Sequence, residues 1–184
     1  MTPGLGTRTA VQLIETFRTP EAVFRASRSE LEAAGISSGL AQSIVSGCAF
    51  DDAVTQQQKL AETGAVAVPF TDPRYPPRLK DIFDPPPLLF GRGNVDLLQE
   101  LAIGIVGTRR PTAYGTTVAA RLAKDLACAG LTIASGMARG IDTAAHRAAL
   151  EVGRGSGGGT IAVFGCGVDE VYPSENRKLA EQIA

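Results

Sequence analysis

Three short segments of the chain combine glycine with arginine or hydroxyl side chains at a regular spacing. Their central glycines are Gly107, Gly136 and Gly165, so successive segments are 29 residues apart. Each glycine follows a short apolar run, and the spacing is typical of one strand, one helix and their connections. Parallel strands joined by right-handed crossovers end at the same edge of a sheet. We therefore expect the three segments to meet in one crevice, where open α/β sheets bind ligands.

The composition of these segments favours phosphate binding. In the first segment, Thr108 supplies a hydroxyl, and Arg109 and Arg110 supply guanidinium groups that can bind phosphate oxygens in pairs. In the second segment, Ser135 and Arg139 precede a predicted helix, whose free N–H groups attract anions. The third segment offers backbone donors and a small thiol. The predicted anion-binding residues are Gly107, Thr108, Arg109, Arg110, Ser135, Gly136, Arg139, Gly140, Gly165, Cys166 and Gly167.

Four further residues near these segments could do chemistry. Asp142 and His146 lie one helical turn apart, a spacing that could serve proton transfer or metal binding. Because no nucleophile or third ligand is evident, we interpret Asp142 as the N-cap of its helix, hydrogen-bonded to His146. Cys166 has no basic neighbour in the sequence that would activate its thiol. Tyr114 could stack on a base, but we prefer packing in the core. We expect no catalytic residue, no metal and no cofactor.

The motifs of common nucleotide cofactors are missing from the sequence. A dinucleotide site needs G-x-G-x-x-G after the first strand and an acidic residue at the end of the second, where this chain has Ser135 and Gly136. The glycine cluster Gly153–Gly159 lacks the Gly-Lys-Ser or Gly-Lys-Thr ending of a P-loop. We interpret this cluster as a flexible surface connection.

The elements that must position these residues alternate in type. Apolar runs at 101–106, 131–134 and 160–164 predict strands, and the residues between them have the apolar spacing of helices. The strands are apolar throughout, as in parallel sheets that helices cover on both faces. The pattern predicts an α/β fold with a doubly wound parallel sheet.

The chain before residue 101 is organised differently. Helical periodicity runs through the first 63 residues, where Ser29 and Glu32 predict a capping box. Seven of the eleven prolines lie between Pro69 and Pro87, which excludes a long helix there. We divide the chain into a small helical domain (1–63), a proline-rich entry segment (64–100) and an α/β domain (101–184).

The overall composition limits the classes of function. The 184 residues include 18 Lys and Arg against 19 Asp and Glu, so nucleic acid could bind only to a local basic patch. No apolar run reaches the 18 to 20 or so residues of a membrane span, and the N-terminus lacks a signal-peptide pattern, so we expect a cytoplasmic protein without a membrane partner. Three cysteines without a CxxC spacing predict neither disulfides nor a zinc site, and we interpret them as small buried hydrophobes or loop residues.

Three motifs, in order, resemble the DNA-processing protein A family, also called Smf. They are GIVGTRRPTAYG, SGMARGIDTAAHRAAL and TIAVFGCGVDEVYPSEN. The segment DPRYPPRLKDIFDPPPLLFGRGN resembles the family's entry into its Rossmann-like domain, and residues 3–10 resemble its helix-hairpin-helix or SAM-like N-terminal part. Gly107, Thr108 and Arg109 match the family's phosphate-contacting Gly-Ser/Thr-Arg motif, and Arg139 lies at the variable position of Gly-x-Ala-x-Gly-Ile-Asp.

This resemblance implies a Rossmann-like fold and a function in DNA recombination. It implies binding of single-stranded DNA without sequence preference, protection of incoming strands in natural transformation, and loading of a RecA-type recombinase. The family forms homodimers largely through a later part of the domain. Because the chain ends at Ala184, before the family's Ser-Gly-Thr motif and winged-helix-like domain, we expect a fragment or an incomplete gene product and do not extend dimerisation or loading to it. The Gly153–Gly159 loop is longer than the family's usual turn.

Two alternatives remain open at this point. An enzyme of the nucleotide-monophosphate phosphoribohydrolase type has a similar fold, but its Pro-Gly-Gly-x-Gly-Thr-x-x-Glu signature is not met after Thr160, where no glutamate follows at the matching distance. A structural partner-binding module is the other alternative. In the N-terminal part, the Gly4–Gly6 turn could bind a phosphate or could simply connect packed helices, and we interpret this part as a protein-contact or spacer domain.

Overall fold

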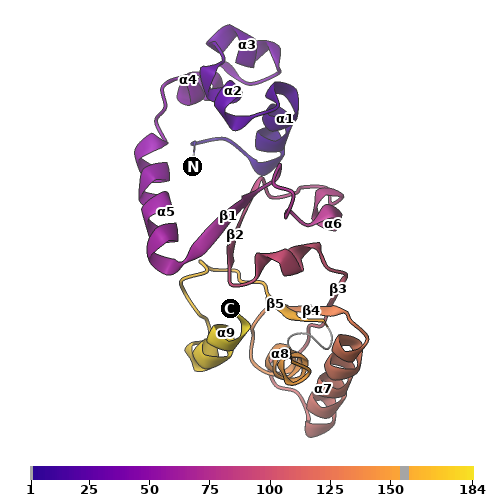
Figure 1. Cartoon of the computed structure of the whole chain (residues 1–184). Coiled ribbons are helices and arrows are strands. Elements are labelled where there is room, and N and C mark those ends of the chain that lie inside the picture. Colours follow the sequence, from indigo (N-terminus) through magenta and orange to yellow (C-terminus); the bar gives the residue numbers. More distant parts are fainter. Residues whose placement is uncertain (1, 154–157) are drawn as a thin grey trace. The chain divides into compact units, whose positions relative to one another are not determined.

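The computed structural model describes residues 2–153 and 158–184, and the chain divides into two compact units, Met1–Phe90 and Gly91–Ala184 (Figure 1). The first unit takes in the proline-rich segment up to Phe90 together with the helices before it. The division of the chain into three parts stays a prediction from the sequence.

The first unit begins with short helices that pack around one apolar cluster. The side chains of Thr19, Ser27 and Ser37 cap three of these helices by accepting a hydrogen bond from a backbone N–H in the first turn. The cluster contains Leu13 and Leu31, at 2% and 0% exposure. The helices are α1 (Thr7–Phe17), α2 (Pro20–Arg25), α3 (Arg28–Ala33), α4 (Ser38–Val45) and α5 (Phe50–Thr63).

The predicted capping box is wrong by two residues. Ser27 and Glu30 form it, and Glu32 instead bonds to Arg28 and Ser38. Both pairs have the required spacing in the sequence, but a helix that begins at Arg28 places Leu31 in the core. The last helix, α5, contributes no buried residue, and it lies beside the strand that follows it (Figure 1).

The proline-rich segment is an ordered connection. Strands β1 (Ala65–Pro69) and β2 (Leu88–Arg92) pair with each other, and the short helix α6 (Pro77–Lys80) lies between them in the chain. Tyr75 is 1% exposed, and its hydroxyl donates a hydrogen bond to the Pro86 carbonyl at 2.8 Å. This bond closes the segment on itself, as an ordered connection requires.

The second unit contains a parallel sheet in the order β3-β4-β5. The central strand, β4, aligns its Ile133 with Ile103 on one side and Thr160 on the other. The elements are η1 (Val95–Gln99), β3 (Ala102–Gly104), α7 (Ala113–Cys128), β4 (Thr132–Ser135), α8 (Ile141–Glu151), β5 (Thr160–Ala162), η2 (Ser174–Asn176) and α9 (Arg177–Ile183).

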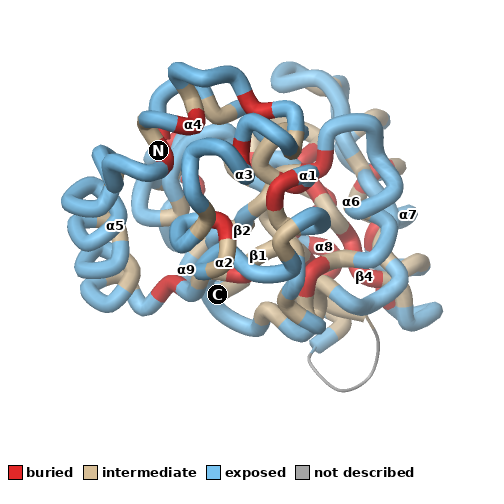
Figure 2. The backbone as a smooth tube through the Cα atoms, turned by 90° about the horizontal axis from the view of Figure 1, so that it is seen from above, coloured by how far each residue is buried: buried red, intermediate tan, exposed pale blue. Residues whose placement is uncertain are grey.

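Alanines form the contact between α7 and α8, which lie side by side against the sheet (Figure 1). Small side chains let the two helix backbones approach closely, and Ile133 of β4 fills the space beneath them. Figure 2 shows buried positions along α8 and β4. The fully or nearly buried members of this core are Ala123, Ala127, Ile133, Ala145, Ala148 and Ala149.

Three details differ from the expectations. The strands are shorter than the apolar runs, and beyond their ends Val106 and Val163 are 74% and 60% exposed. Tyr114 is 80% exposed, so its predicted place in the core is wrong. All three cysteines are exposed, so they are not buried hydrophobes. Of the predicted connection Gly153–Gly159, residues 154–157 lie outside the described residues.

Candidate nucleic-acid interface

Three loops follow the parallel strands at one edge of the sheet. We call them the first loop (105–112, after β3), the second loop (136–140, after β4) and the third loop (163–173, after β5). The first two are in contact, because the Ile141 N–H donates to the Thr108 carbonyl at 3.3 Å. A Cβ on Gly140 would lie 3.0 Å from the Arg109 carbonyl carbon. The structure therefore brings the backbone of Arg109 against the end of the second loop.

Asp142 joins the first two loops through its carboxylate. This side chain is 5% exposed and accepts hydrogen bonds from the backbone N–H groups of Gly107, Gly136 and Ala138, at 3.3, 3.2 and 3.3 Å. The predicted N-cap role is wrong, because Gly140 is the N-cap of α8 and Asp142 is its second residue. A buried carboxylate that neutralises backbone dipoles in this way fixes loop geometry.

His146 is a buried, neutral residue of the core. Its Nδ1 lies 2.7 Å from Thr160 Oγ1, and the Thr160 hydroxyl donates to the Ile133 carbonyl at 2.8 Å. Nδ1 must therefore be the donor, which assigns the tautomer. Burial lowers the pKa of His146 to about 4, although Asp142 and the Ser135 backbone act in the opposite direction. The predicted hydrogen bond to Asp142 is wrong, since Thr160 takes that place.

The second loop is held from outside by Asn176, a residue to which sequence reasoning gave no role. Its Nδ2 donates to the Met137 carbonyl and to Thr143 Oγ1, both at 2.9 Å, and the residue is 2% exposed. Met137 is itself fully buried, and its backbone φ is 62°, a value that residues other than glycine rarely adopt. An asparagine in the Pro-Ser-Glu-Asn run, just before a helix, was the available signal.

The arginines of the loops differ in their partners. Arg109 and Arg110 are exposed and form no ion pair with any residue in the described ranges. Arg139, by contrast, forms a two-point ion pair with Glu175 of η2, with both N–O distances 2.9 Å. Hydrogen bonding to Glu175 raises the pKa of the Arg139 guanidinium. The first loop is thus the more strongly positive of the two.

Ser135 and the glycines of the third loop are less suited to bind phosphate, for different reasons. Ser135 is 3% exposed, and its hydroxyl donates to the Ile105 carbonyl at 2.6 Å, so the geometry does not favour a ligand contact. Gly165, Cys166 and Gly167 are exposed on the third loop, where the Cys166 thiol donates to the Glu170 carbonyl at 3.0 Å. The loop also contains Asp169 and Glu170, so it is acidic beside its glycines.

A groove of 720 Å³ opens between α7 and α8 and begins at Gly140, the last residue of the second loop. Its floor is formed by alanines, and the Lys124–Glu151 ion pair, at 3.2 Å, bridges the two helices. Arg147 is exposed and has no ion pair within the described part of the chain. The cations of the lining are Arg121, Lys124 and Arg147, of which Arg121 pairs with Asp125 and Lys124 with Glu151.

The described residues offer neither a metal site nor a membrane span. No group of three or more His, Cys, Asp and Glu side chains in 2–153 and 158–184 is arranged to hold a metal ion. None of the described helices has both the length and the apolar character needed to cross a membrane.

Known proteins with similar sequences point to one family. A family model described as DNA recombination-mediator protein A matches residues 66–184. The chain is 43% identical over 124 residues to DNA processing protein DprA of Bacillus subtilis. The matched region is 67% of this chain and 40% of that protein. It is 44% identical over 112 residues to DprA of Streptococcus pneumoniae, covering 61% and 38%. The chain thus spans two fifths or less of the length of these relatives.

Solved structures agree with the sequence comparison. The X-ray structure of DNA processing protein A from Streptococcus pneumoniae matches with a TM-score of 0.77 at 31% identity, over 99% of this chain and 61% of that one. DNA processing protein A from Helicobacter pylori, whose structure concerns its single-stranded DNA binding mode, matches with a TM-score of 0.56 at 33% identity, over 65% and 51%. These matches confirm the predicted Rossmann-like fold, and the chain belongs to the DNA recombination-mediator protein A family.

Proposed function

We propose that this chain binds single-stranded DNA through its first and second loops. The observation that carries the proposal is the pair of exposed guanidinium groups, Arg109 and Arg110, on a loop whose backbone Asp142 and Gly140 hold in place. Contacts to phosphate carry no sequence information, which suits a protein that must accept any strand. The Helicobacter pylori relative, described for its binding of single-stranded DNA, supports the same assignment.

We further propose that binding, rather than catalysis, is the role of this site. The two groups of SGMARGIDTAAHRAAL that could transfer protons are closed to a ligand: the Asp142 carboxylate accepts three backbone hydrogen bonds, and His146 is fully buried. We also propose that the bound strand is protected in the cytoplasm and delivered to a RecA-type recombinase. An assay for base release from nucleoside monophosphates tests the enzymatic alternative.

The site itself is tested by measuring affinity for a fluorescent oligo-dT at several salt concentrations. For the double variant Arg109→Ala/Arg110→Ala we expect weaker binding and a salt dependence, d log K/d log[salt], that is shallower by about 1.4, because each lost contact to a single-stranded phosphate changes it by about 0.7. Arg25→Ala, which removes an exposed arginine of α2 in the first unit, is the matched control. Unchanged affinity and slope in the double variant would contradict the assignment.

A further inference from the structure

Two tyrosines of the second unit are unusually exposed. Tyr114 and Tyr172 are 80% and 71% exposed, whereas Tyr75, in the first unit, is 1% exposed. Exposure alone does not mark a contact surface, since Phe50 is also 71% exposed, but an open ring beside cationic groups offers a face on which a ligand can stack.

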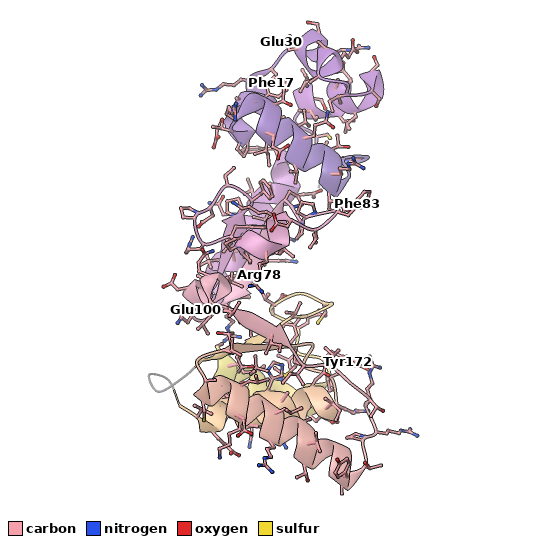
Figure 3. The ribbon with its side chains drawn as sticks, turned by 90° about the vertical axis from the view of Figure 1, so that its right-hand side faces the viewer. Phe17, Glu30, Arg78, Phe83, Glu100 and Tyr172 are labelled. Atoms are coloured by element: carbon pink, nitrogen blue, oxygen red, sulfur yellow. The ribbon has the colours of Figure 1, made fainter. Side chains whose placement is uncertain are left out.

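Tyr114 lies near the arginines of the first loop along the chain, and Tyr172 lies near Arg139 in space. Tyr114 is the second residue of α7 and follows Arg110 by four positions, directly after the first loop. Tyr172 lies in the third loop, one residue before its end (Figure 3). It precedes Glu175 by three residues, and the Glu175 carboxylate pairs with Arg139 at 2.9 Å. Tyr172 is also close enough to Arg139 to contribute to the raised pKa of its guanidinium.

The chemistry of a single strand matches this arrangement. A single strand presents charged phosphates on one side and unpaired bases on the other. Guanidinium groups bind the phosphates, and an exposed aromatic ring can stack on a base whatever the base is. Resting on the proposed function, we propose that Tyr114 and Tyr172 are stacking platforms for the bases of the strand that the loops hold.

Paired substitutions and paired ligands test this role. Tyr114→Ala and Tyr172→Ala should each bind oligo-dT between about 5-fold and about 150-fold more weakly, the range found for single base–aromatic stacks. Tyr114→Phe and Tyr172→Phe keep the ring and should bind as the unchanged protein does. An oligomer of the same length with abasic sites has the phosphates without the bases, so the alanine variants should bind it with unchanged affinity. Phe50→Ala, which removes a ring 71% exposed in the first unit, controls for loss of any exposed aromatic residue.

Tyrosine emission gives an independent measurement. The chain has no tryptophan, and Tyr75 is buried in the first unit, so solvent-exposed tyrosine emission comes from Tyr114 and Tyr172. Oligo-dT should quench this emission, and the abasic oligomer should not. If the alanine variants bind oligo-dT as tightly as the unchanged protein, the stacking role is wrong while the phosphate site stands. If neither oligomer binds the unchanged protein, the proposed function and the stacking role both fail.

Discussion

The carboxylate of Asp142 accepts a hydrogen bond from the backbone N–H of Gly107, 35 positions earlier in the chain, at 3.3 Å. The same side chain also binds the N–H groups of Gly136 and Ala138, so one buried acid sets the backbone of the loops after β3 and β4. The arginines of these loops are presented on a backbone that is fixed before any ligand arrives. Such preorganisation reduces the ordering cost of binding.

Asp142→Asn tests this arrangement through stability. The amide keeps one acceptor but turns its NH₂ group toward backbone N–H donors, so at least one buried donor loses its partner. We expect the free energy of unfolding to fall by about 2 to 4 kcal/mol, measured by urea denaturation. Asp125→Asn, an exposed carboxylate of α7, is the matched control and should change it by less than about 0.5 kcal/mol. Equal effects of the two substitutions would show that Asp142 does not hold the loops.

Gly140→Ala should separate loop packing from ligand approach. Gly140 has a φ of 81°, and a Cβ there would meet the Thr108 carbonyl and lie 2.7 Å from Pro111 Cδ. The substitution therefore strains the backbone and pushes the first loop away, and we expect a loss of about 2 to 4 kcal/mol in unfolding free energy together with weaker DNA binding. Gly165→Ala meets no atom within 4 Å and should stay within about 0.5 kcal/mol of the unchanged protein. A stable Gly140→Ala variant would contradict this view of the turn.

The spacing of the strand-end glycines was enough to predict parallel strands. The equal steps between Gly107, Gly136 and Gly165 indicate one strand and one helix per step, and β3, β4 and β5 do pair in parallel. The order of the strands in the sheet was not predicted. The hydrogen-bond partners of Asp142 could not be predicted from the sequence, because they depend on the positive φ values of Met137 and Gly140. Glycine in a sequence suggests a positive φ, but methionine does not, so the conformation of Met137 could not be predicted.

The prediction that Tyr114 packs in the core was wrong, because the sequence near it does not show which face of its helix is buried. Aromatic residues near a helix start are often core residues, but the face of α7 that meets the sheet and α8 carries Ala119, Ala123 and Ala127. These alanines define a stripe that leaves Tyr114 on another side of the helix. The partner of Arg139 was equally hidden, because Glu175 lies 36 positions away and reaches it only through the fold.

Glu175→Gln should strengthen DNA binding. In the structure, Glu175 occupies the guanidinium of Arg139, so a phosphate must displace a carboxylate before it can bind there. Both side chains are more than half exposed, and a surface pair of this kind contributes about 1 kcal/mol at most, so we expect affinity for oligo-dT to rise by up to about 5-fold. Fluorescence anisotropy at low salt measures the change.

Glu170→Gln is the control for Glu175→Gln. It removes the same charge from the exposed third loop, where Glu170 forms no ion pair with a described residue. If both substitutions raise the affinity equally, the effect is general electrostatics and the Arg139–Glu175 pair has no special part in it. In Arg139→Ala, Glu175→Gln should lose most of its effect.

His146 should make the stability of the fold depend on pH between about 4 and 6.5. Its folded-state pKa is about 4 because burial disfavours the charged ring, whereas the unfolded chain should titrate near 6.5. Between these values the unfolded state binds more protons, so the contribution is fully present above pH 6.5 and is lost as the pH falls toward 4. The difference between the two pKa values corresponds to a change of about 3 kcal/mol in the free energy of unfolding over this pH range.

The pH effect can be isolated because the chain has a single histidine. Carboxylates also titrate below pH 5, so the informative quantity is the difference in unfolding free energy between the unchanged protein and His146→Gln, followed from pH 7 to pH 4. That difference should shrink as the pH falls, because the glutamine variant has no ring to protonate. The histidine ring resonance in NMR should show a neutral ring at pH 5.5, and a ring that titrates near 6.5 in the folded protein would contradict the prediction.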